Sequence, residues 1–333
     1  MNQFQALDLQ TLCQRICENK RTLIIYHVRS DADAIGSAFA LRELLRLMGI
    51  PAVCACSDEI PDRLRFLADG VQGSVVIEDD MGLDHQRVIS VDSASPQQLG
   101  AMFERLHRQV DLMIDHHGMG TVYADHYIDD EACATGEIVY EIAKELLRMG
   151  KIDEIPPRVI HSVYAAICSD TGCFRYSNAT PRAFRTAAEL IERGADQTEI
   201  NRCLFESKSF KQIKAEGEAA SRMQLHHGGR IASVTFPYSS KRNLDLQDAH
   251  LETIIDIPRS VAGVEVAFSV RQPEDTSFFR VSMRSTDAVD VAAICARFGG
   301  GGHKRAAGCS VEAASVRDAE EKILQAVCEA MGL

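Results

Sequence analysis

A histidine and two aspartates stand close together near the start of the chain, at a spacing that suits metal chemistry. His27, Asp31 and Asp33 follow the apolar run 23–26. Carboxylate and imidazole ligands without thiolates suit Mn²⁺ or Mg²⁺ better than a structural zinc ion. In a tight loop Asp31 and Asp33 can point towards two adjacent ions. The alternative is that Asp31 or Ser30 only caps the following helix, a common role for these residue types.

Further acids and imidazoles follow apolar stretches later in the chain. Asp92, the triplet Asp115-His116-His117, and Asp170 each end such a stretch. An aspartate in this position is normally paired, capping or metal-bound. The candidate residues that share this placement are His27, Asp31, Asp33, Asp92, His116, His117 and Asp170. A set of this size can hold two ions about 3.5–4 Å apart, which activate a water molecule and clamp a phosphoryl group.

Apolar runs alternate with helical patterns through the first half of the chain. The patterns predict strands over 22–27, 51–56, 74–77, 87–92 and 111–115, and helices over 7–18, 34–48, 96–106, 134–149 and 156–170. Strands separated by helices are typical of an α/β fold, with a parallel sheet and helices on both faces. The carboxyl ends of parallel strands meet at one edge of the sheet. We therefore expect the candidate ligands to converge at that edge.

The second half of the chain changes character near Arg230. Helices are expected over 180–193, 196–206 and 208–224, followed by strands over 231–236, 261–270, 278–284 and 306–311 and helices over 288–297 and 313–331. The four glycines 299–302 are costly inside regular structure. They suit an irregular loop whose backbone N–H groups approach an anion. At 333 residues the chain is long for a single core, so two domains are expected.

Composition narrows the functional classes. The formal net charge of −12 argues against a surface that binds long nucleic acid without regard to sequence. The eleven cysteines are odd in number, scattered and without a CxxC pair, which indicates reduced, buried thiols and neither a disulfide framework nor a structural zinc site. No stretch of roughly 20 apolar residues is present to span a bilayer, so a cytoplasmic protein is expected.

Five motifs in order resemble the DHH phosphoesterase family, in the branch with a C-terminal DHHA1 domain. The resemblance rests on His27-x3-Asp31-Ala32-Asp33, the strand end at Asp92, Asp115-His116-His117, Asp170-Thr171-Gly172, and the segment Gly299 to His303. The chain is most similar to the stand-alone enzymes that degrade very short oligoribonucleotides and dephosphorylate 3′-phosphoadenosine 5′-phosphate (pAp). One departure is Ser30, where many relatives have proline.

The family pattern implies two divalent cations. Mn²⁺ is the expected metal, and Mg²⁺ is the alternative. One ion would be held by His27, Asp31 and Asp92, and the other by Asp33, Asp92, His116 and Asp170. His117 would contact the scissile phosphate or the leaving oxygen, and Asp115 would orient a histidine. The pairs Asp125-His126 and His226-His227 are expected to lie outside the site.

The resemblance also implies a domain organisation in which each part of the chain has its own role. Residues 1–190 would form the catalytic DHH domain, 191–225 a helical connector, and 226–333 a smaller α/β DHHA1 domain that binds substrate. The residues expected to grip the terminal phosphate and nucleotide are Arg284, Ser285, Gly300, Gly301, Gly302 and His303. The planar guanidinium of arginine matches a phosphate group.

The implied activity is hydrolysis of short oligoribonucleotides to mononucleotides and removal of the 3′-phosphate of pAp. The partners would be these substrates and, as an alternative to a monomer, a second copy of the chain; long nucleic acid and membranes are not expected. Two other functions stay open. One is a cyclic-dinucleotide phosphodiesterase of the same family, and the other is a non-catalytic nucleotide-binding module.

Overall fold

The computed structural model describes residues 4–68, 74–76, 85–286 and 289–333. The chain forms two compact units, which we call unit 1 (Met1–Ser207) and unit 2 (Lys208–Leu333). The division falls inside the segment 191–225 that the sequence predicts as a connector. Each unit is described by itself.

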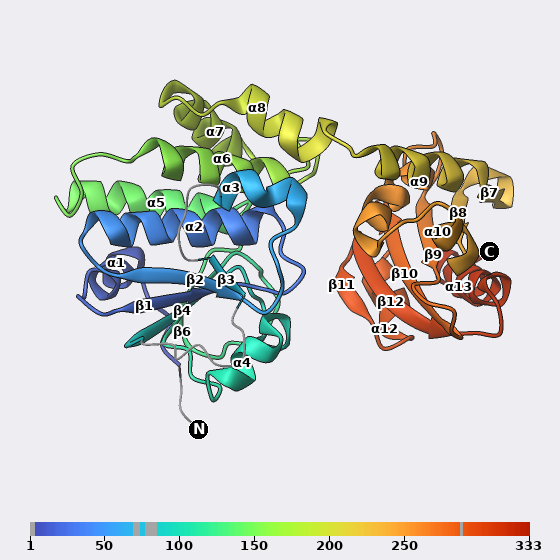
Figure 1. Ribbon diagram of the computed structural model, residues 1–333, viewed down its shortest axis with the longest axis horizontal. Helices are drawn as coiled ribbons and strands as arrows, with labels where there is room; N and C mark the ends of the chain where they lie inside the picture. The colour runs from blue at the N-terminus through green and yellow to red at the C-terminus, as the bar shows by residue number, and fades with distance from the viewer. Residues whose placement is uncertain (1–3, 69–73, 77–84, 287–288) are drawn as a thin grey trace. The chain divides into compact units, whose positions relative to one another are not determined.

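Unit 1 is built on a six-stranded sheet in which every neighbouring pair of strands is parallel (Figure 1). The order is β3-β2-β1-β4-β5-β6. The strands are β1 (Thr22–Ile25), β2 (Ala52–Cys56), β3 (Ser74–Val76), β4 (Arg87–Val91), β5 (Leu112–Asp115) and β6 (Asp125–Ile128). The strand order reverses between β1 and β4. In open parallel sheets, the carboxyl edge at such a reversal is where ligands bind.

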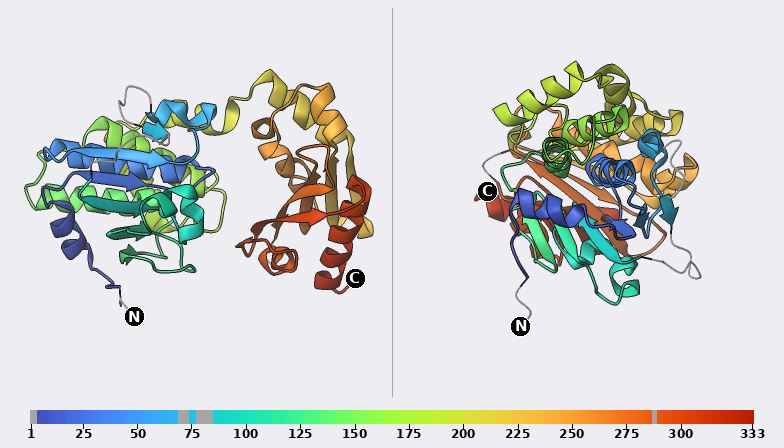
Figure 2. Two further views of the ribbon diagram at one scale, coloured as in Figure 1. Left: turned by 60° about the horizontal axis from the view of Figure 1, so that its bottom comes forward. Right: turned by 90° about the vertical axis from the view of Figure 1, so that its left-hand side faces the viewer.

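Helices cover both faces of this sheet (Figure 2). The elements are α1 (Leu9–Ile16), α2 (Ala32–Leu47), η1 (Asp62–Leu64), α3 (Arg65–Ala68), η2 (Pro96–Leu99), α4 (Ala101–Arg105), α5 (Thr135–Arg148), α6 (Pro157–Asp170), α7 (Pro181–Glu192), α8 (Gln197–Asn201) and the π-helical turn η3 (Arg202–Glu206). Within β1, Ile24 packs into the core beneath α2, α5 and α6, while Leu23 and Ile25 pack into the core beneath α4. Burial of both faces explains why the strands read as continuous apolar runs.

Unit 2 contains a second six-stranded sheet, of order β11-β12-β10-β9-β8-β7, in which only the β8–β9 pair is parallel. Its strands are β7 (Met223–His226), β8 (Ile231–Phe236), β9 (Val266–Arg271), β10 (Phe278–Ser285), β11 (Gly301–His303) and β12 (Ala306–Glu312). Its helices are α9 (Phe210–Ser221), η4 (His227–Gly229), α10 (Tyr238–Asn243), η5 (Asp248–Ile255), α11 (Asp256–Arg259), α12 (Val291–Ala296) and α13 (Val316–Met331). Helices α12 and α13 pack on one face, and α9 and η5 on the other.

The α/β class and the two-sheet organisation are confirmed, but several predicted elements are wrong in detail. The helix predicted over 96–106 is broken at Gly100, whose φ is +57°. A side chain there would lie 2.6 Å from the Val28 side chain, so only glycine fits this turn. The strand predicted over 261–270 begins only at Val266, because residues 261–264 form a turn.

Three short strands contradict the sequence interpretation. Residues Asp125 and His126 lie within β6, and β7 follows the helix that was expected to reach residue 224. Both strands lie at sheet edges and carry polar residues, so no apolar run marks them. The segment 301–303, expected as a loop, pairs with β12. Glycine is required just before it, since a Cβ on Gly300 would lie 2.2 Å from the Gly308 carbonyl oxygen.

Two predicted elements touch residues outside the described part of the chain, namely the strand end at residue 77 and the helix start at residue 288. Within the described part, no helix combines the length and apolar character needed to cross a membrane.

Candidate metal centre

The loop after β1 and the start of α2 position the first three candidate ligands. Asp31 is the N-cap of α2: its Oδ1 accepts hydrogen bonds from the backbone N–H groups of Asp33 and Ala34, both at 3.0 Å. Asp31 therefore caps α2. The same oxygen lies 3.7 Å from His27 Nε2, so capping also fixes this carboxylate beside the histidine. Asp33 lies in the first turn of the helix rather than in the preceding loop.

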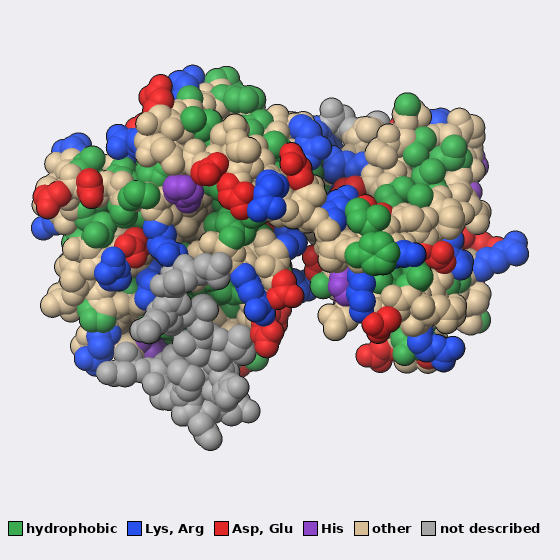
Figure 3. All heavy atoms as spheres, turned by 45° about the horizontal axis from the view of Figure 1, so that its top comes forward, with side chains coloured by type: hydrophobic (Ala, Val, Ile, Leu, Met, Phe, Trp, Pro, Cys, Tyr) green, Lys and Arg blue, Asp and Glu red, His purple; other side chains and the backbone are tan. Residues whose placement is uncertain are grey.

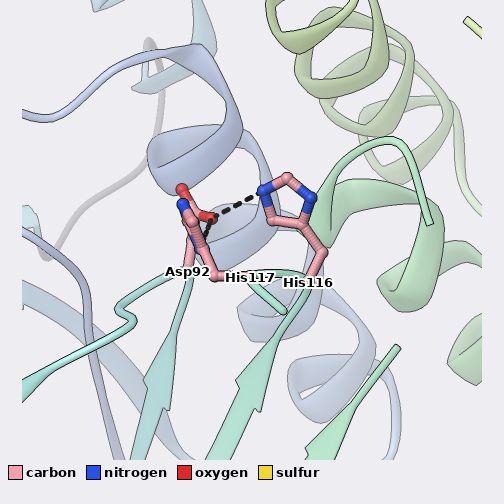
Figure 4. Close-up of side chains that lie close together, drawn as sticks. All are labelled: Asp92, His116 and His117. Atoms are coloured by element: carbon pink, nitrogen blue, oxygen red, sulfur yellow. Dashed lines mark ion pairs between the residues drawn. The ribbon is translucent and has the colours of Figure 1, made fainter. Parts of the chain in front are cut away.

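The Asp92 carboxylate lies between two groups of candidate ligands. Asp92 directly follows β4, next to β1 at the point where the strand order reverses, and its backbone has a φ of +52°. Its Oδ2 lies 3.4 Å from His27 Nε2, and its Oδ1 lies 3.7 Å from His116 Nε2. Figure 4 shows Asp92 with the two histidines that follow β5. A single carboxylate therefore reaches both groups.

The structure brings all seven candidate residues together. Ligand atoms lie within 4.8 Å of one another in each of three groups: His27, Asp31 and Asp92; Asp33, His116 and Asp170; and Asp92, His116 and His117. In the second group, His116 Nε2 lies 3.8 Å from Asp33 and 3.3 Å from Asp170. An ion placed between these atoms would contact both the imidazole and the carboxylates.

Backbone hydrogen bonds turn the two candidate imidazoles in the same sense. His27 Nδ1 donates to the carbonyl of Val28 at 2.9 Å, and His116 Nδ1 donates to the carbonyl of Ala132 at 3.3 Å. The Nε2 atom of each ring therefore faces the carboxylates. Metal-ligating histidines are commonly oriented in this way through the second ring nitrogen.

Thr135, at the start of α5, holds two of the carboxylates, a role that was not predicted from the sequence. Its backbone N–H donates to Asp33 Oδ2 at 2.7 Å, and its hydroxyl donates to Asp92 Oδ1 at 3.0 Å. Gly136 N–H and the Ser37 hydroxyl donate to Asp33 Oδ1 at 2.8 and 2.9 Å. The sequence signal is Thr135-Gly136-Glu137 at a helix start, because the first amides of a helix have no partner within the helix and attract anions.

The crowded carboxylates depart from their ordinary protonation behaviour. Burial, together with the charges of Asp92 and Asp31, raises the pKa of Asp33, and burial with the charge of Asp33 raises the pKa of Asp170. Burial also opposes ionisation of Asp92, but His27 outweighs it and lowers the pKa of that carboxyl. Burial lowers the pKa of His27, yet hydrogen bonds to Asp31 and Asp92 outweigh this and raise it to about 12. Protonation relieves the repulsion among these buried carboxylates, and a bound cation would relieve it in the same way.

Asp115 and His117 form a separate pair beside the ligands. Asp115 has no exposed surface, and its Oδ1 accepts a hydrogen bond from His117 Nδ1 at 2.7 Å and from the backbone N–H of His116 at 2.8 Å. Burial acts to lower the pKa of His117, but the bond to Asp115 outweighs it and raises the pKa to about 9. The imidazole is therefore protonated at neutral pH.

Two further polar residues, both missed from the sequence, support the loops that carry the site. Asn178 Nδ2 donates to the carbonyls of Cys133 and Asp170, both at 3.1 Å. The fully buried Glu137 carboxylate accepts from Cys133 N–H and from the Thr186 hydroxyl, both at 3.0 Å. The sequence signal for Glu137 is its place in the first turn of a predicted helix, on the apolar face.

The candidate substrate residues lie at one end of three neighbouring strands in unit 2. Arg284 in β10 pairs with Ala306 in β12, which pairs in turn with His303 in β11. The Ser285 hydroxyl donates to the Val289 carbonyl at 2.6 Å, and Arg284 Nη1 donates to the Met283 carbonyl at 2.9 Å. The side chain of His303 lies outside the described part of the structure.

The two residue pairs expected outside the site, Asp125-His126 and His226-His227, have other partners. Asp125 forms an ion pair with Arg15, and His226 Nε2 lies 2.8 Å from the Ser233 hydroxyl. Neither pair contributes to a candidate metal group among the described residues.

Comparison with known proteins matches most of the chain to the two domains that the sequence motifs resemble. Residues 21–167 match the DHH family, N-terminal domain, and residues 231–332 match the DHHA1 domain. The bifunctional oligoribonuclease and PAP phosphatase NrnA of Thermus thermophilus is 30% identical over 309 residues, covering 92% of this chain and 89% of that protein. The protein of the same name from Bacillus subtilis is 25% identical over 317 residues, covering 92% and 95%.

Two other comparisons bear on the fold and on the alternatives. The cyclic-di-AMP phosphodiesterase GdpP of Geobacillus thermodenitrificans is 25% identical over 95% of this chain, which spans 48% of that protein. The crystal structure of an exopolyphosphatase-related protein from Bacteroides fragilis has a TM-score of 0.84 at 21% identity, covering 97% of this chain and 95% of that chain. This second likeness shows a shared fold.

Proposed function

The chain belongs to the DHH family and carries a DHHA1 domain, and we propose on this basis that it hydrolyses short oligoribonucleotides to mononucleotides and removes the 3′-phosphate of pAp. Two relatives that span nearly the whole chain are named for these two activities. The observation that carries the proposal is the Asp92 carboxylate, shared between the His27 and His116 groups at the reversal of strand order.

The residues present suit two divalent cations. His27, Asp31 and Asp92 would hold one ion, and Asp33, Asp92, His116 and Asp170 the other. Oxygen and imidazole ligands without a thiolate favour Mn²⁺, with Mg²⁺ second. When bound, such ions would supply a nucleophilic water and neutralise charge on the transferring phosphoryl group. The raised pKa values of Asp33 and Asp170 support this assignment, since a cation would relieve the repulsion that causes them.

The protein's own groups position the substrate and hold a proton. His117, protonated and fixed by Asp115 through Nδ1, places a positive charge beside the ligands, where it would contact the scissile phosphate. In this arrangement the imidazolium neutralises charge as the leaving oxygen departs and can donate its proton to that oxygen. In unit 2, Arg284, Ser285 and the glycines 300–302 would bind the terminal phosphate.

Surface charge favours short substrates over long ones. The net charge is −12, and on the face drawn in Figure 3 the acidic and basic side chains are interspersed. A protein that follows a long phosphate backbone needs a continuous basic groove. A phosphate bound locally by a few groups requires no such groove, and it admits both a dinucleotide and pAp.

A product time course tests the proposal. The substrates are 5′-labelled RNA dimers to pentamers, a long RNA strand, pAp and cyclic di-AMP, each in Mn²⁺, in Mg²⁺ and in EDTA. Rapid metal-dependent turnover of dimers and pAp, with little on the long strand or the cyclic substrate, is expected. A preference for cyclic di-AMP would favour a signalling phosphodiesterase, which the likeness to GdpP makes the second candidate. Absence of any metal-dependent turnover would favour a nucleotide-binding module.

A further inference from the structure

Arg182, the second residue of α7, contacts both sides of the loop that orients His116, and we propose that it positions His116 for one of the two ions and not for the other. The loop comprises residues 129–134, between β6 and α5, and we call it the strap. Arg182 acts through other side chains, so it is a positioning residue and not a ligand. The inference rests on the proposed function in that unit 1 binds divalent cations.

The strap carries the carbonyl that orients His116. The Ala132 carbonyl accepts a hydrogen bond from His116 Nδ1 at 3.3 Å, which leaves Nε2 facing Asp33 and Asp170. The Ala132 N–H donates to the Asp129 carbonyl at 3.1 Å, so a shift at the start of the strap is passed on to Ala132. Any movement of the strap therefore moves the acceptor that fixes the imidazole.

Two carboxylates hold the strap on either side of Ala132. Asp129 begins the strap, and its Oδ2 accepts a hydrogen bond from Arg182 Nη1 at 2.7 Å. Glu137 lies in the first turn of α5, and its Oε2 accepts from the Cys133 N–H at 3.0 Å. The other oxygen, Oε1, lies 3.6 Å from Arg182 Nε. One guanidinium therefore joins both carboxylates, which its planar fork of donors allows.

Burial makes this guanidinium important for Glu137. The Glu137 side chain has no exposed surface, whereas those of Asp129 and Arg182 are 21% and 32% exposed. The Thr186 hydroxyl donates to Glu137 Oε1 at 3.0 Å, and Arg182 supplies the opposite charge. Removing one partner of a buried ion pair leaves an uncompensated charge. The surrounding chain relieves such a charge by moving, and here the chain that would move is the strap.

The strap is also tied to the backbone of a second ligand. Asn178 Nδ2 donates to the carbonyls of Cys133 and Asp170, both at 3.1 Å. The Asp170 carboxylate lies 3.3 Å from His116 Nε2. A displaced strap would therefore disturb two ligands of the same candidate ion.

A different part of the chain orients the other ligand group. We call the two candidate ion positions the His27 site and the His116 site. His27 Nδ1 donates to the Val28 carbonyl, and Asp31 is held by the first turn of α2. These contacts lie in the segment after β1 and do not use the strap. Loss of Arg182 should therefore weaken the ion at His116 and spare the ion at His27.

Direct measurement of Mn²⁺ binding tests this selectivity in full-length variants that keep one site at a time. Asp31→Asn removes a ligand of the His27 site and keeps an oxygen for the helix cap, and Asp170→Asn removes a ligand of the His116 site. Electron paramagnetic resonance of free Mn²⁺ gives the bound fraction without reference to activity. Adding Arg182→Met to Asp31→Asn should raise the dissociation constant by about 10–100-fold. Adding it to Asp170→Asn should leave the dissociation constant nearly unchanged.

Three further variants, each in the Asp31→Asn background, show how Arg182 acts. Arg185→Met changes an exposed arginine of the same helix and should have no effect, so it is the matched control. Arg182→Lys keeps the charge but loses the fork, so its dissociation constant should be intermediate. Glu137→Gln combined with Arg182→Met removes the buried charge and keeps an oxygen for the Cys133 N–H, so part of the lost affinity should return.

The outcomes separate this inference from the proposed function. Arg182→Met that weakens both sites equally, or neither, would overturn the selective role of Arg182. Failure of Glu137→Gln to restore any affinity would overturn the route through the buried carboxylate. If the unmodified protein takes up no Mn²⁺, the metal sites and the proposed function fail together. If it binds two ions and hydrolyses neither RNA nor pAp, the activity fails while the effect of Arg182 on Mn²⁺ binding is still measured.

Discussion

At the scale of single residues, the site depends on how fixed donors hold each carboxylate. Asp33 receives the backbone N–H groups of Thr135 and Gly136 and the hydroxyl of Ser37, and Asp92 receives the hydroxyl of Thr135. Side chains held in this way cannot rotate to avoid one another. The site therefore keeps its negative charges close together, which favours binding of a cation over release of one.

Thr135→Val removes one of these donors with little change in volume. The backbone N–H to Asp33 stays, but the hydroxyl that orients Asp92 is lost. We expect Mn²⁺ affinity to fall by about 10–100-fold, a typical effect of losing a group that orients a ligand. Titration of activity against free Mn²⁺ measures this, and Thr135→Ser should restore affinity. Equal affinity in Thr135→Val and in the parent would contradict the role.

The Asp115–His117 pair predicts a specific change in pH dependence. Asp115 raises the pKa of His117 to about 9, so the imidazole stays protonated until the pH approaches that value. In Asp115→Asn the pKa should fall towards the ordinary value near 6.5, so the alkaline limb of the kcat profile should move to lower pH. Asp125→Asn, which alters an ion pair outside the site, is the matched control. An unmoved alkaline limb would show that His117 does not act as an acid.

At the scale of elements, close packing of α2 against α6 keeps Asp33 and Asp170 within reach of one histidine. Gly36 in α2 makes this contact possible, since a Cβ there would lie 2.6 Å from the Ser162 carbonyl oxygen of α6. Both helices pack on the sheet that contains β1 and β4. Alternate residues of these strands fill the cores on the two faces of that sheet. The separation of these helices therefore sets the separation of the ligands.

A pair of glycine substitutions tests this packing. Gly36→Ala should lower the free energy of unfolding by about 1–3 kcal/mol, because the helices must move apart. Gly217→Ala, also within a helix but with no atom within 4 Å of the added Cβ, should raise it by about 0.5–1 kcal/mol through the better helix propensity of alanine. Urea unfolding of the full chain measures both. Stabilisation by Gly36→Ala would refute the crowded contact.

The elements also show what can be predicted from sequence. Strands β1, β4 and β5 were predicted to within two residues, because burial on both faces makes each a continuous apolar run. The edge strands β6 and β7 have no such run and were missed. Thr135 was missed as a donor because its contact with Asp92 depends on the approach of α5 to β4, across 43 residues of sequence. Local patterns carry no information on that approach.

At the scale of the whole molecule, two units with separate cores should respond differently to metal. All candidate ligands lie in unit 1, and unit 2 has its own sheet and core. A ligand that binds only the folded state stabilises it by mass action, by about 2.7 kcal/mol at a hundredfold excess over its dissociation constant. Mn²⁺ should therefore stabilise unit 1 against heat and leave unit 2 unchanged.

Calorimetry of the full chain at two pH values tests this expectation. Without metal, the pKa of His27 in the folded state is raised to about 12. The stability that this histidine contributes is therefore complete below about pH 6.5 and declines as the pH rises. The raised pKa values of Asp33 and Asp170 also make the folded state less stable as the pH rises. Bound metal requires deprotonated ligands, so its stabilising effect should increase over the same range. The Mn²⁺-induced rise in the melting temperature of unit 1 should thus be larger at about pH 8 than at about pH 6.5. Asp92→Asn should abolish this rise, because the Asp92 carboxylate belongs to both ligand groups. A shift that persists in Asp92→Asn, or that appears equally in both transitions, would place the ions elsewhere.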